Sequence, residues 1–148
     1  MAPPPGPVLG VDLGDVRIGV AVSDPDRRVA VPVGTVHVGR PPGELRAIAE
    51  LVAEHGATLV VLGLPVSMDG SEGARAALAR AFADALRAAL PVPVVLHDER
   101  LSTVEADRAL AAAGVPGRER RAVIDAAAAQ VILAGWLDAQ RADPPPGD

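Results

Sequence analysis

Cysteine, lysine and tyrosine are absent from this chain of 148 residues, and one Trp and one Phe are its only aromatic rings. Without cysteine the chain can form neither a disulfide nor a thiolate metal site, and it has no cysteine nucleophile. The near absence of aromatic rings disfavours a carbohydrate-cleaving enzyme, whose cleft is usually lined by them. No apolar run approaches the roughly 18 residues of a membrane-spanning helix, and the N-terminus has no signal-peptide pattern. We therefore expect a cytoplasmic protein without a membrane partner.

Acidic residues outnumber basic ones, with 19 Asp and Glu against 14 Arg, which gives a net charge of −5. This balance argues against a protein that coats nucleic acid through bulk positive charge, although a local basic patch stays possible. The replacement of all lysine by arginine fits the codon usage of a GC-rich genome, and we infer no function from it. The length suits one domain. We expect this domain at 8–140, between disordered proline-rich tails at 1–7 and 141–148.

Hydrophobic periodicity predicts three strands, then helices that alternate with two further strands, and finally two consecutive helices. The strands are expected at 8–13, 17–22, 29–38, 58–64 and 92–97, and the helices at 41–55, 72–89, 103–113 and 120–139. Pro32 places the third strand at an edge or an irregularity. This order indicates an α/β protein with a mixed five-stranded sheet and helices on both faces. It is the element order of the RNase H-like fold.

Asp12 interrupts the apolar strand predicted at 8–13. A buried carboxylate is strongly unfavourable unless it is paired or binds a metal, so Asp12 is a candidate site residue. The alternative is structural, because an Asp at this position can also accept hydrogen bonds from backbone N–H groups of the turn that follows.

Asp98 and Glu99 end the strand predicted at 92–97. Open α/β sheets carry their sites at the carboxyl ends of such strands. Successive side chains point to opposite faces, so only one of the two acids is expected to join a shared site. The alternative is a charged strand end that faces water. If all apolar strands share one sheet, we expect Asp12 and Glu99 on adjacent strands.

Asp125 lies in an otherwise apolar helix, where Ala128, Ala129 and Ile132 share its face. Small alanines would let this helix approach the sheet closely and bring the carboxylate to it. The alternative is an acid near a helix N-terminus that interacts favourably with the helix dipole.

Taken together, the three carboxylates would lie on two strand ends and one helix. Phosphoryl transfer by two metal ions needs such a cluster, because hard cations about 3.5–4 Å apart require several carboxylate oxygens. Two acids that act without metal, as in glycosidases, are the alternative chemistry.

Two other segments have ordinary structural explanations. Ser102 and Glu105 match a capping box, which predicts a helix start rather than a metal ligand. The loop at 65–73 could hold a phosphate at the N-terminus of the next helix. It could equally be a plain connection with Ser71 as the helix cap.

Four segments together resemble the YqgF (RuvX) family, RNase H-like proteins described as Holliday-junction-resolvase-like and as pre-16S rRNA nucleases. They are GVDLGDVRIGVAVSD at 10–24, LGLPVSMDGSEG at 62–73, DERLSTVEA at 98–106 and IDAAAA at 124–129. The similarity covers about residues 8–138. Two positions depart from the family pattern: Ser67 stands where Asn is usual, and Val16 stands where Lys is frequent.

The resemblance implies that Asp12, Glu99 and Asp125 are the catalytic residues and hold two Mg²⁺ or Mn²⁺ ions, with Glu99 preferred over Asp98. One ion would activate water and the other would stabilise the leaving 3′-oxygen. The expected contacts to the substrate are Arg17, Asp69, Arg100, Arg118 and Arg121, with Arg120 as a further candidate. The segment 114–121 carries a net charge of +2, from three Arg and one Glu.

The function implied by the resemblance is hydrolysis of phosphodiester bonds in 5′-end maturation of pre-16S rRNA. One alternative is a resolvase of branched DNA, which needs two active sites and hence a dimer. Another is an RNA-binding maturation factor without catalysis, but no acid has been lost here. An ATPase of the actin and sugar-kinase type would need a second lobe, for which 148 residues leave no room. The sequence does not specify the oligomeric state.

Overall fold

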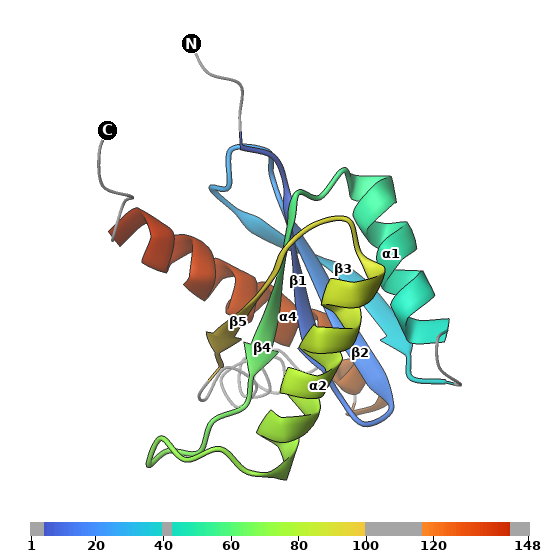
Figure 1. The fold of residues 1–148 in the computed structure, drawn as a ribbon, viewed down its shortest axis with the longest axis vertical. Coiled ribbons are helices and arrows are strands. Elements are labelled where there is room, and N and C mark those ends of the chain that lie inside the picture. Colours follow the sequence, from blue (N-terminus) through green and yellow to red (C-terminus); the bar gives the residue numbers. More distant parts are fainter. Residues whose placement is uncertain (1–4, 40–42, 100–116, 143–148) are drawn as a thin grey trace.

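The computed structural model describes residues 5–39, 43–99 and 117–142, with the side chains of the last helix described over 125–140 (Figure 1). The elements are β1 (Val8–Leu13), β2 (Arg17–Ser23), β3 (Ala30–His37), α1 (Gly43–His55), β4 (Leu59–Leu64), α2 (Ala74–Ala89), β5 (Val94–Asp98) and α4 (Gly117–Ala142). They agree with the predicted order, and the predicted helix at 103–113 lies outside the described residues. No described helix has the length and apolar character needed to cross a bilayer.

The five strands form one mixed sheet in the order β3-β2-β1-β4-β5. Strands β1, β2 and β3 are antiparallel neighbours, whereas β4 and β5 run parallel to β1. The predicted sheet is therefore confirmed, but the expected adjacency of the strands that carry Asp12 and Glu99 is wrong. Because β4 pairs directly with β1, β5 can add only on the outer side of β4.

Strand alternation divides the hydrophobic core into two layers. Leu9, Val11 and the other odd-numbered side chains of β1 face α1 and α2. Val8 faces α4, together with Val61 of β4. Figure 1 shows α1 and α2 on one side of the sheet and α4 on the other. Strand β4 is buried along its whole length, as expected for a central strand covered by helices on both faces.

Edge strand β3 contains the proline that predicted an edge or an irregularity. The register between β2 and β3 shifts between Val20 and Ala21, whose partners are Gly34 and Pro32. A proline cannot donate a ladder hydrogen bond, so an edge strand with a bulge is where it is tolerated.

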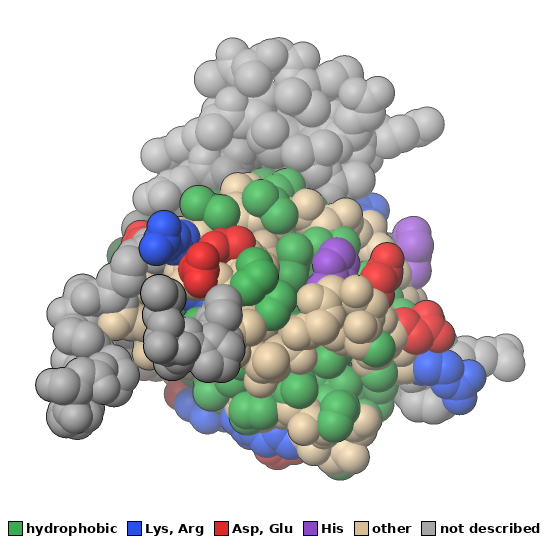
Figure 2. Space-filling model, turned by 90° about the horizontal axis from the view of Figure 1, so that it is seen from above, with side chains coloured by type: hydrophobic (Ala, Val, Ile, Leu, Met, Phe, Trp, Pro, Cys, Tyr) green, Lys and Arg blue, Asp and Glu red, His purple; other side chains and the backbone are tan. Residues whose placement is uncertain are grey.

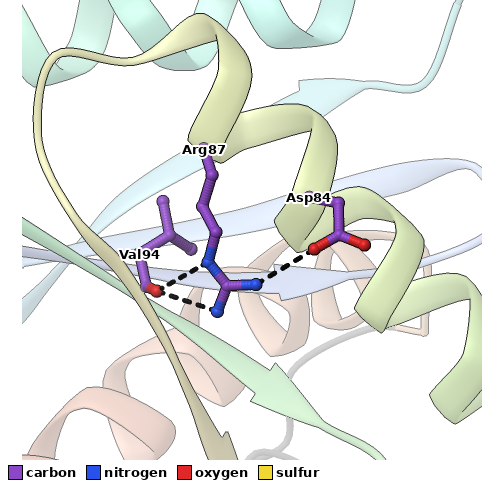
Figure 3. A network of polar contacts seen from close by, with 3 residues as sticks. All are labelled: Asp84, Arg87 and Val94. Carbon is purple, nitrogen blue, oxygen red and sulfur yellow. Dashed lines mark hydrogen bonds and ion pairs between the residues drawn. The ribbon is translucent and has the colours of Figure 1, made fainter.

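Arg87 fastens the end of α2 to the start of β5 (Figure 3). Its Nε and Nη2 donate to the carbonyl oxygen of Val94 at 3.1 and 3.0 Å, and its Nη1 contacts Asp84 at 3.1 Å. These contacts help to position the first residue of β5, and through it Asp98 and Glu99 at the other end of the strand.

Residues 5–7 are hydrogen-bonded to the domain. The backbone N–H of Gly6 donates to the carbonyl of Pro25 at 3.1 Å, and that of Thr58 donates to Pro7 at 2.8 Å. Arg27 adds a bond from its Nε to the carbonyl of Gly6. The disordered tails predicted at 1–7 and 141–148 are therefore too long, because residues 5–7 are bonded to the domain and 141–142 belong to α4. Residues 1–4 and 143–148 lie outside the described part, and for them the tails stay a prediction.

Helix α2 begins later than predicted, at Ala74, and its N-cap is Gly73 without a side-chain cap. The alternative in which Ser71 caps this helix is wrong. Ser71 donates instead to Asp69, from its backbone N–H at 2.9 Å and from its hydroxyl at 2.6 Å. Asp69 thus orders the loop before the helix rather than the helix itself.

The end of the molecule opposite the arrowheads of β4 and β5 carries a mixed surface (Figure 2). Hydrophobic side chains lie at its centre, and acidic and basic side chains lie around them. The described residues therefore gather no charge of a single sign on this face, and it is a poor candidate for a polyanion.

Glycines let α4 approach the sheet closely. A Cβ atom at Gly10 of β1 would lie 2.8 Å from the Cβ of Leu133, and one at Gly19 of β2 would overlap the backbone carbonyl of Asp125. The second contact is with backbone, which cannot rotate away. The position of Asp125 over the sheet therefore depends on Gly19.

We predict that Gly19→Ala lowers the free energy of unfolding by about 1–3 kcal/mol, the usual penalty for overpacking a core. Urea denaturation followed by circular dichroism would measure it. Gly39→Ala is the matched control, because a Cβ there meets no atom within 4 Å. Equal stabilities of the two variants would contradict the close approach of α4.

Candidate active site

Asp12 sits between two glycines on the face of the sheet covered by α4. Gly19 of β2 is its direct partner in the antiparallel ladder. On the other side Val11 pairs with Leu62 of β4, so Asp12 lies level with the next residue, Gly63. Three strands therefore present one carboxylate and two positions without a side chain, which leaves room for groups from elsewhere.

Glu99 fills the space above Gly63. Its backbone N–H donates to the carbonyl of Leu64 at 3.2 Å, which extends the pairing of β5 with β4 by one residue. A Cβ at Gly63 would overlap the Oε2 atom of Glu99. The Glu99 side chain thus crosses β4 above Gly63 and reaches the carboxyl of Asp12, with which it shares a hydrogen bond. The two acids meet across an intervening strand.

Burial and nearby negative charge raise the pKa of both acids. Burial, the adjacent Asp12 charge and the shared hydrogen bond raise the pKa of Glu99 to about 8. Burial also raises the pKa of Asp12, opposed by the hydrogen bond from Glu99. Near neutral pH the Glu99 carboxyl therefore carries a proton and donates it to the carboxyl of Asp12.

Glu99 also has an unsatisfied oxygen. Its Oε2 atom is buried and has no hydrogen-bond partner. A buried acceptor without a donor destabilises the fold, so this oxygen is available to a ligand that supplies a proton or a positive charge.

Asp125 projects from α4 beside this pair. Its Oδ2 atom accepts a 2.6 Å hydrogen bond from the Nε of Arg17, and both side chains are 27% exposed. The negative charge of Asp125 contributes to the raised pKa of Asp12. All three predicted acids therefore lie in one neighbourhood, with Asp125 held by an arginine while Asp12 and Glu99 bond to each other.

The donor set suits a divalent cation in part. Hard cations bind carboxylate oxygens. In the Asp12–Glu99 pair, a proton on Glu99 occupies the position between the carboxyls that a cation would take, and the Oε2 atom of Glu99 has no hydrogen-bond partner. No cluster of three acidic or histidine side chains within metal-binding distance occurs in the described ranges. The third carboxylate, Asp125, is turned towards Arg17.

Arg75 is a site residue that the sequence reasoning missed. Its charge lowers the pKa of both Asp12 and Glu99, against the larger effect of burial. It lies in the first turn of α2, just beyond the carboxyl end of β4. That position in the chain was the only available signal, because one arginine in an alanine-rich helix has no distinctive pattern.

Asp98 behaves as strand alternation predicted. It is exposed, whereas Glu99 is partly buried among Gly63 and Ile132 on the α4 side. His97, on the same side as Glu99, packs near Gly135 of α4. Asp98 pairs regularly with Leu64 at the end of β5.

The remaining predicted contacts are only partly described. Arg17 is engaged by Asp125, and Asp69 is an exposed loop residue bonded to Ser71. Arg100 lies outside the described residues, and the side chains of Arg118, Arg120 and Arg121 are not described.

We predict that the metal-free protein loses stability as the pH rises from about 5 to 8. Glu99 titrates near 4.5 when unfolded and near 8 when folded, so in this window the folded state binds more protons and deprotonation favours unfolding. Glu99→Gln should flatten this dependence and raise the melting temperature at pH 8. Thermal unfolding in EDTA at pH 5 and pH 8 measures it, and parallel losses in wild type and variant would contradict the shared proton.

Comparison with known proteins assigns the chain to a family. The RuvX family, described as Holliday junction resolvase, matches residues 6–139. Proteins named "Putative pre-16S rRNA nuclease" are similar over most of their length. The one from Anaeromyxobacter sp. (strain K) is 55% identical over 88% of this chain and 95% of its own. The one from Myxococcus xanthus (strain DK1622) is 53% identical over 95% and 91%.

Solved structures agree on the fold. RuvC of T. thermophilus in complex with a Holliday junction substrate matches with a TM-score of 0.52 and 18% identity, over 92% of this chain and 96% of RuvC. The Fowlpox virus resolvase with Holliday junction DNA matches with a TM-score of 0.54 and 9% identity, over 90% and 97%. The RNase H-like fold predicted from the element order is confirmed, and the chain belongs to the RuvX family.

Proposed function

We propose that the chain is a metal-dependent nuclease that hydrolyses phosphodiester bonds of pre-16S rRNA during maturation of its 5′ end. The observation that carries this proposal is the Asp12–Glu99 pair, two half-buried carboxyls that meet above Gly63, where the Oε2 atom of Glu99 is buried without a hydrogen-bond partner. Membership of a nuclease family and relatives named for pre-16S rRNA support the reaction and the substrate.

A cation bound between Asp12 and Glu99 would relieve the repulsion of their carboxylates. Two close carboxylates repel each other, and in the metal-free protein a proton relieves that repulsion. Mg²⁺ or Mn²⁺ would replace the proton, with Asp12 and Glu99 as ligands and Asp125 as the third. A bound pair of such ions supplies an activated water and stabilises the leaving 3′-oxygen.

The chain's own residues orient the acids and the substrate. Gly63 gives Glu99 its path to Asp12, and Gly19 lets α4 carry Asp125 to the sheet. Arg17 holds Asp125 in place at 2.6 Å, and its remaining guanidinium donors can bind a phosphate of the substrate. Arg75 adds positive charge on the other side of the acids. We include Asp69, Arg100, Arg118 and Arg121 as further substrate contacts.

Branched DNA is the second candidate substrate, because the family description names Holliday junctions. We favour RNA, because the relatives that are more than half identical are named for pre-16S rRNA. A cytoplasmic location follows from an rRNA substrate. An RNA-binding factor without catalysis fits less well, because it gives no reason to keep two repelling acids buried together.

The decisive experiment depletes the protein in its native host and maps the 5′ ends of 16S rRNA. Extended 5′ ends that mature when the purified protein and Mg²⁺ are added to the precursor would support the proposal. Normal 5′ ends, together with cleavage of four-way DNA junctions in vitro, would support the resolvase instead.

We predict that Asp12→Asn and Asp125→Asn abolish metal-dependent cleavage and preserve the fold. An amide keeps the shape of the side chain but loses most of the attraction for a divalent ion. Cleavage of a labelled precursor in Mg²⁺ measures activity, and circular dichroism checks the fold. Asp138→Asn, an exposed acid on the same helix as Asp125, is the control and should cut at the wild-type rate. A fully active Asp125→Asn protein would make that acid purely structural.

We predict unequal effects for the neighbouring acids of β5. Glu99→Gln should reduce the rate by several powers of ten, because it removes an oxygen ligand at the centre of the site. Asp98→Asn should reduce it by no more than about 10–100-fold, the range of a group that only supports a ligand. Single-turnover rates at saturating Mg²⁺ compare the two. Equally severe losses would show that four carboxylates act at the site.

A further inference from the structure

A pocket opens between α1 and α2, on the face of the sheet opposite the three acids. It has a volume of about 430 Å³, within the size range of small-molecule sites. Its lining includes Leu13, Glu44, Leu45, Pro65, Arg75 and Phe82. Nothing in the proposed reaction at the carboxylates uses this space.

Residues that line the pocket are sequence neighbours of residues in the carboxylate site. Leu13 directly follows Asp12, and Pro65 directly follows Leu64, whose carbonyl accepts the hydrogen bond of the Glu99 backbone. Arg75 lines the pocket and also acts electrostatically on Asp12 and Glu99. The pocket therefore opens at the same edge of the sheet as the acids, with Arg75 between them.

The walls suit a flat, largely apolar group. Phe82 is the only phenylalanine of the chain, and it lines the pocket together with Leu45 and the alanines of α2. Leu78, also in the lining, is 60% exposed. An aromatic ring in an apolar recess offers a stacking surface for an unstacked nucleobase.

Glu44 places in the pocket a carboxylate oxygen that needs a hydrogen-bond donor from a ligand. It lies in the first turn of α1, and its Oε2 atom is buried without a hydrogen-bond partner. An unsatisfied carboxylate oxygen in an apolar recess is unfavourable, so a ligand that donates a hydrogen bond there gains affinity. No ion pair to Arg75 is found among the described residues, which leaves its guanidinium to bind a phosphate.

We propose that this pocket is a guanine-binding subsite for the nucleic acid that the carboxylate site cleaves. A carboxylate presents two acceptors side by side, and the Watson–Crick edge of guanine presents two adjacent donors, N1–H and the 2-amino group. Adenine and cytosine place an acceptor beside their amino group, and uracil flanks its single N–H with two carbonyls. Each of these three would set an oxygen or nitrogen lone pair against Glu44.

This inference rests on the proposed function for its substrate but makes a separate claim. A base that leaves its stack would enter the pocket, stack on Phe82 and pair with Glu44. Its phosphate would lie at Arg75, and the next part of the strand would pass to the acids. The subsite would thus select where the strand is cut, while the carboxylates perform the cleavage.

The single phenylalanine supplies a direct reporter of the pocket. Protein labelled with ¹³C only at phenylalanine gives the signals of one ring, Phe82. We would titrate it in EDTA with the 5′-monophosphates of guanosine, adenosine, cytidine and uridine. We expect a saturable shift of the Phe82 signals and at least about tenfold tighter binding of the guanosine nucleotide, the selectivity of a bidentate pair. No shift with any nucleotide, or equal affinity for all four, would overturn the proposal.

Two variants test the assigned contacts. Glu44→Gln replaces one acceptor by a donor and should abolish the guanine preference, because an amide presents one donor beside one acceptor and the Watson–Crick edge of each base can match that pattern. Glu54→Gln, an exposed acid on the same helix, should leave the preference unchanged. Arg75→Gln should weaken the nucleotide but not the nucleoside guanosine. An unchanged preference in Glu44→Gln would overturn the role of Glu44.

The titration also separates this inference from the proposed nuclease activity. It uses no metal and measures no cleavage, so selective guanine binding by a protein that fails to cut would remove the nuclease proposal and keep the subsite. Cleavage of precursor RNA that is insensitive to Glu44→Gln would do the reverse. Short RNA and DNA strands with one guanine in a pyrimidine background then distinguish the two kinds of nucleic acid.

Discussion

The close approach of three chain segments above Asp12 is the constraint on which the site depends. Asp12 is one of three neighbouring positions across β2, β1 and β4, and the other two are Gly19 and Gly63. One glycine admits the backbone of α4, and the other admits the carboxylate of Glu99. The site is therefore built as much by two missing side chains as by the acids themselves.

The fold holds the acids close together although burial and like charge disfavour their ionised forms. Burial and like charge raise the pKa of Asp12 and Glu99, and the chain opposes this only weakly, with Arg75 near both acids and Arg17 bound to Asp125. The apolar layers on either side of the sheet supply the stability that such an arrangement needs. Strained electrostatics of this kind mark functional sites more often than structural ones.

Much of this arrangement can be predicted from the sequence because polar residues interrupt apolar patterns. Asp12 and Asp125 stand out in apolar segments, and alternation along β5 correctly separates Asp98 from Glu99. The order of strands in the sheet is a long-range property that no local pattern carries, which is why Asp12 and Glu99 were expected on adjacent strands. Gly63 and Arg75 were missed because their roles exist only once β4 lies between the acids.

The passage of Glu99 above Gly63 also limits how this sequence can diverge. A side chain at position 63 would occupy the path of the carboxylate, and aspartate at position 99 would be too short by one methylene to cross the strand. The two positions are therefore expected to vary together or not at all during evolution. A relative with a larger residue at the position of Gly63 would have to draw its second acid from another strand, and would amount to a different solution to the same chemistry.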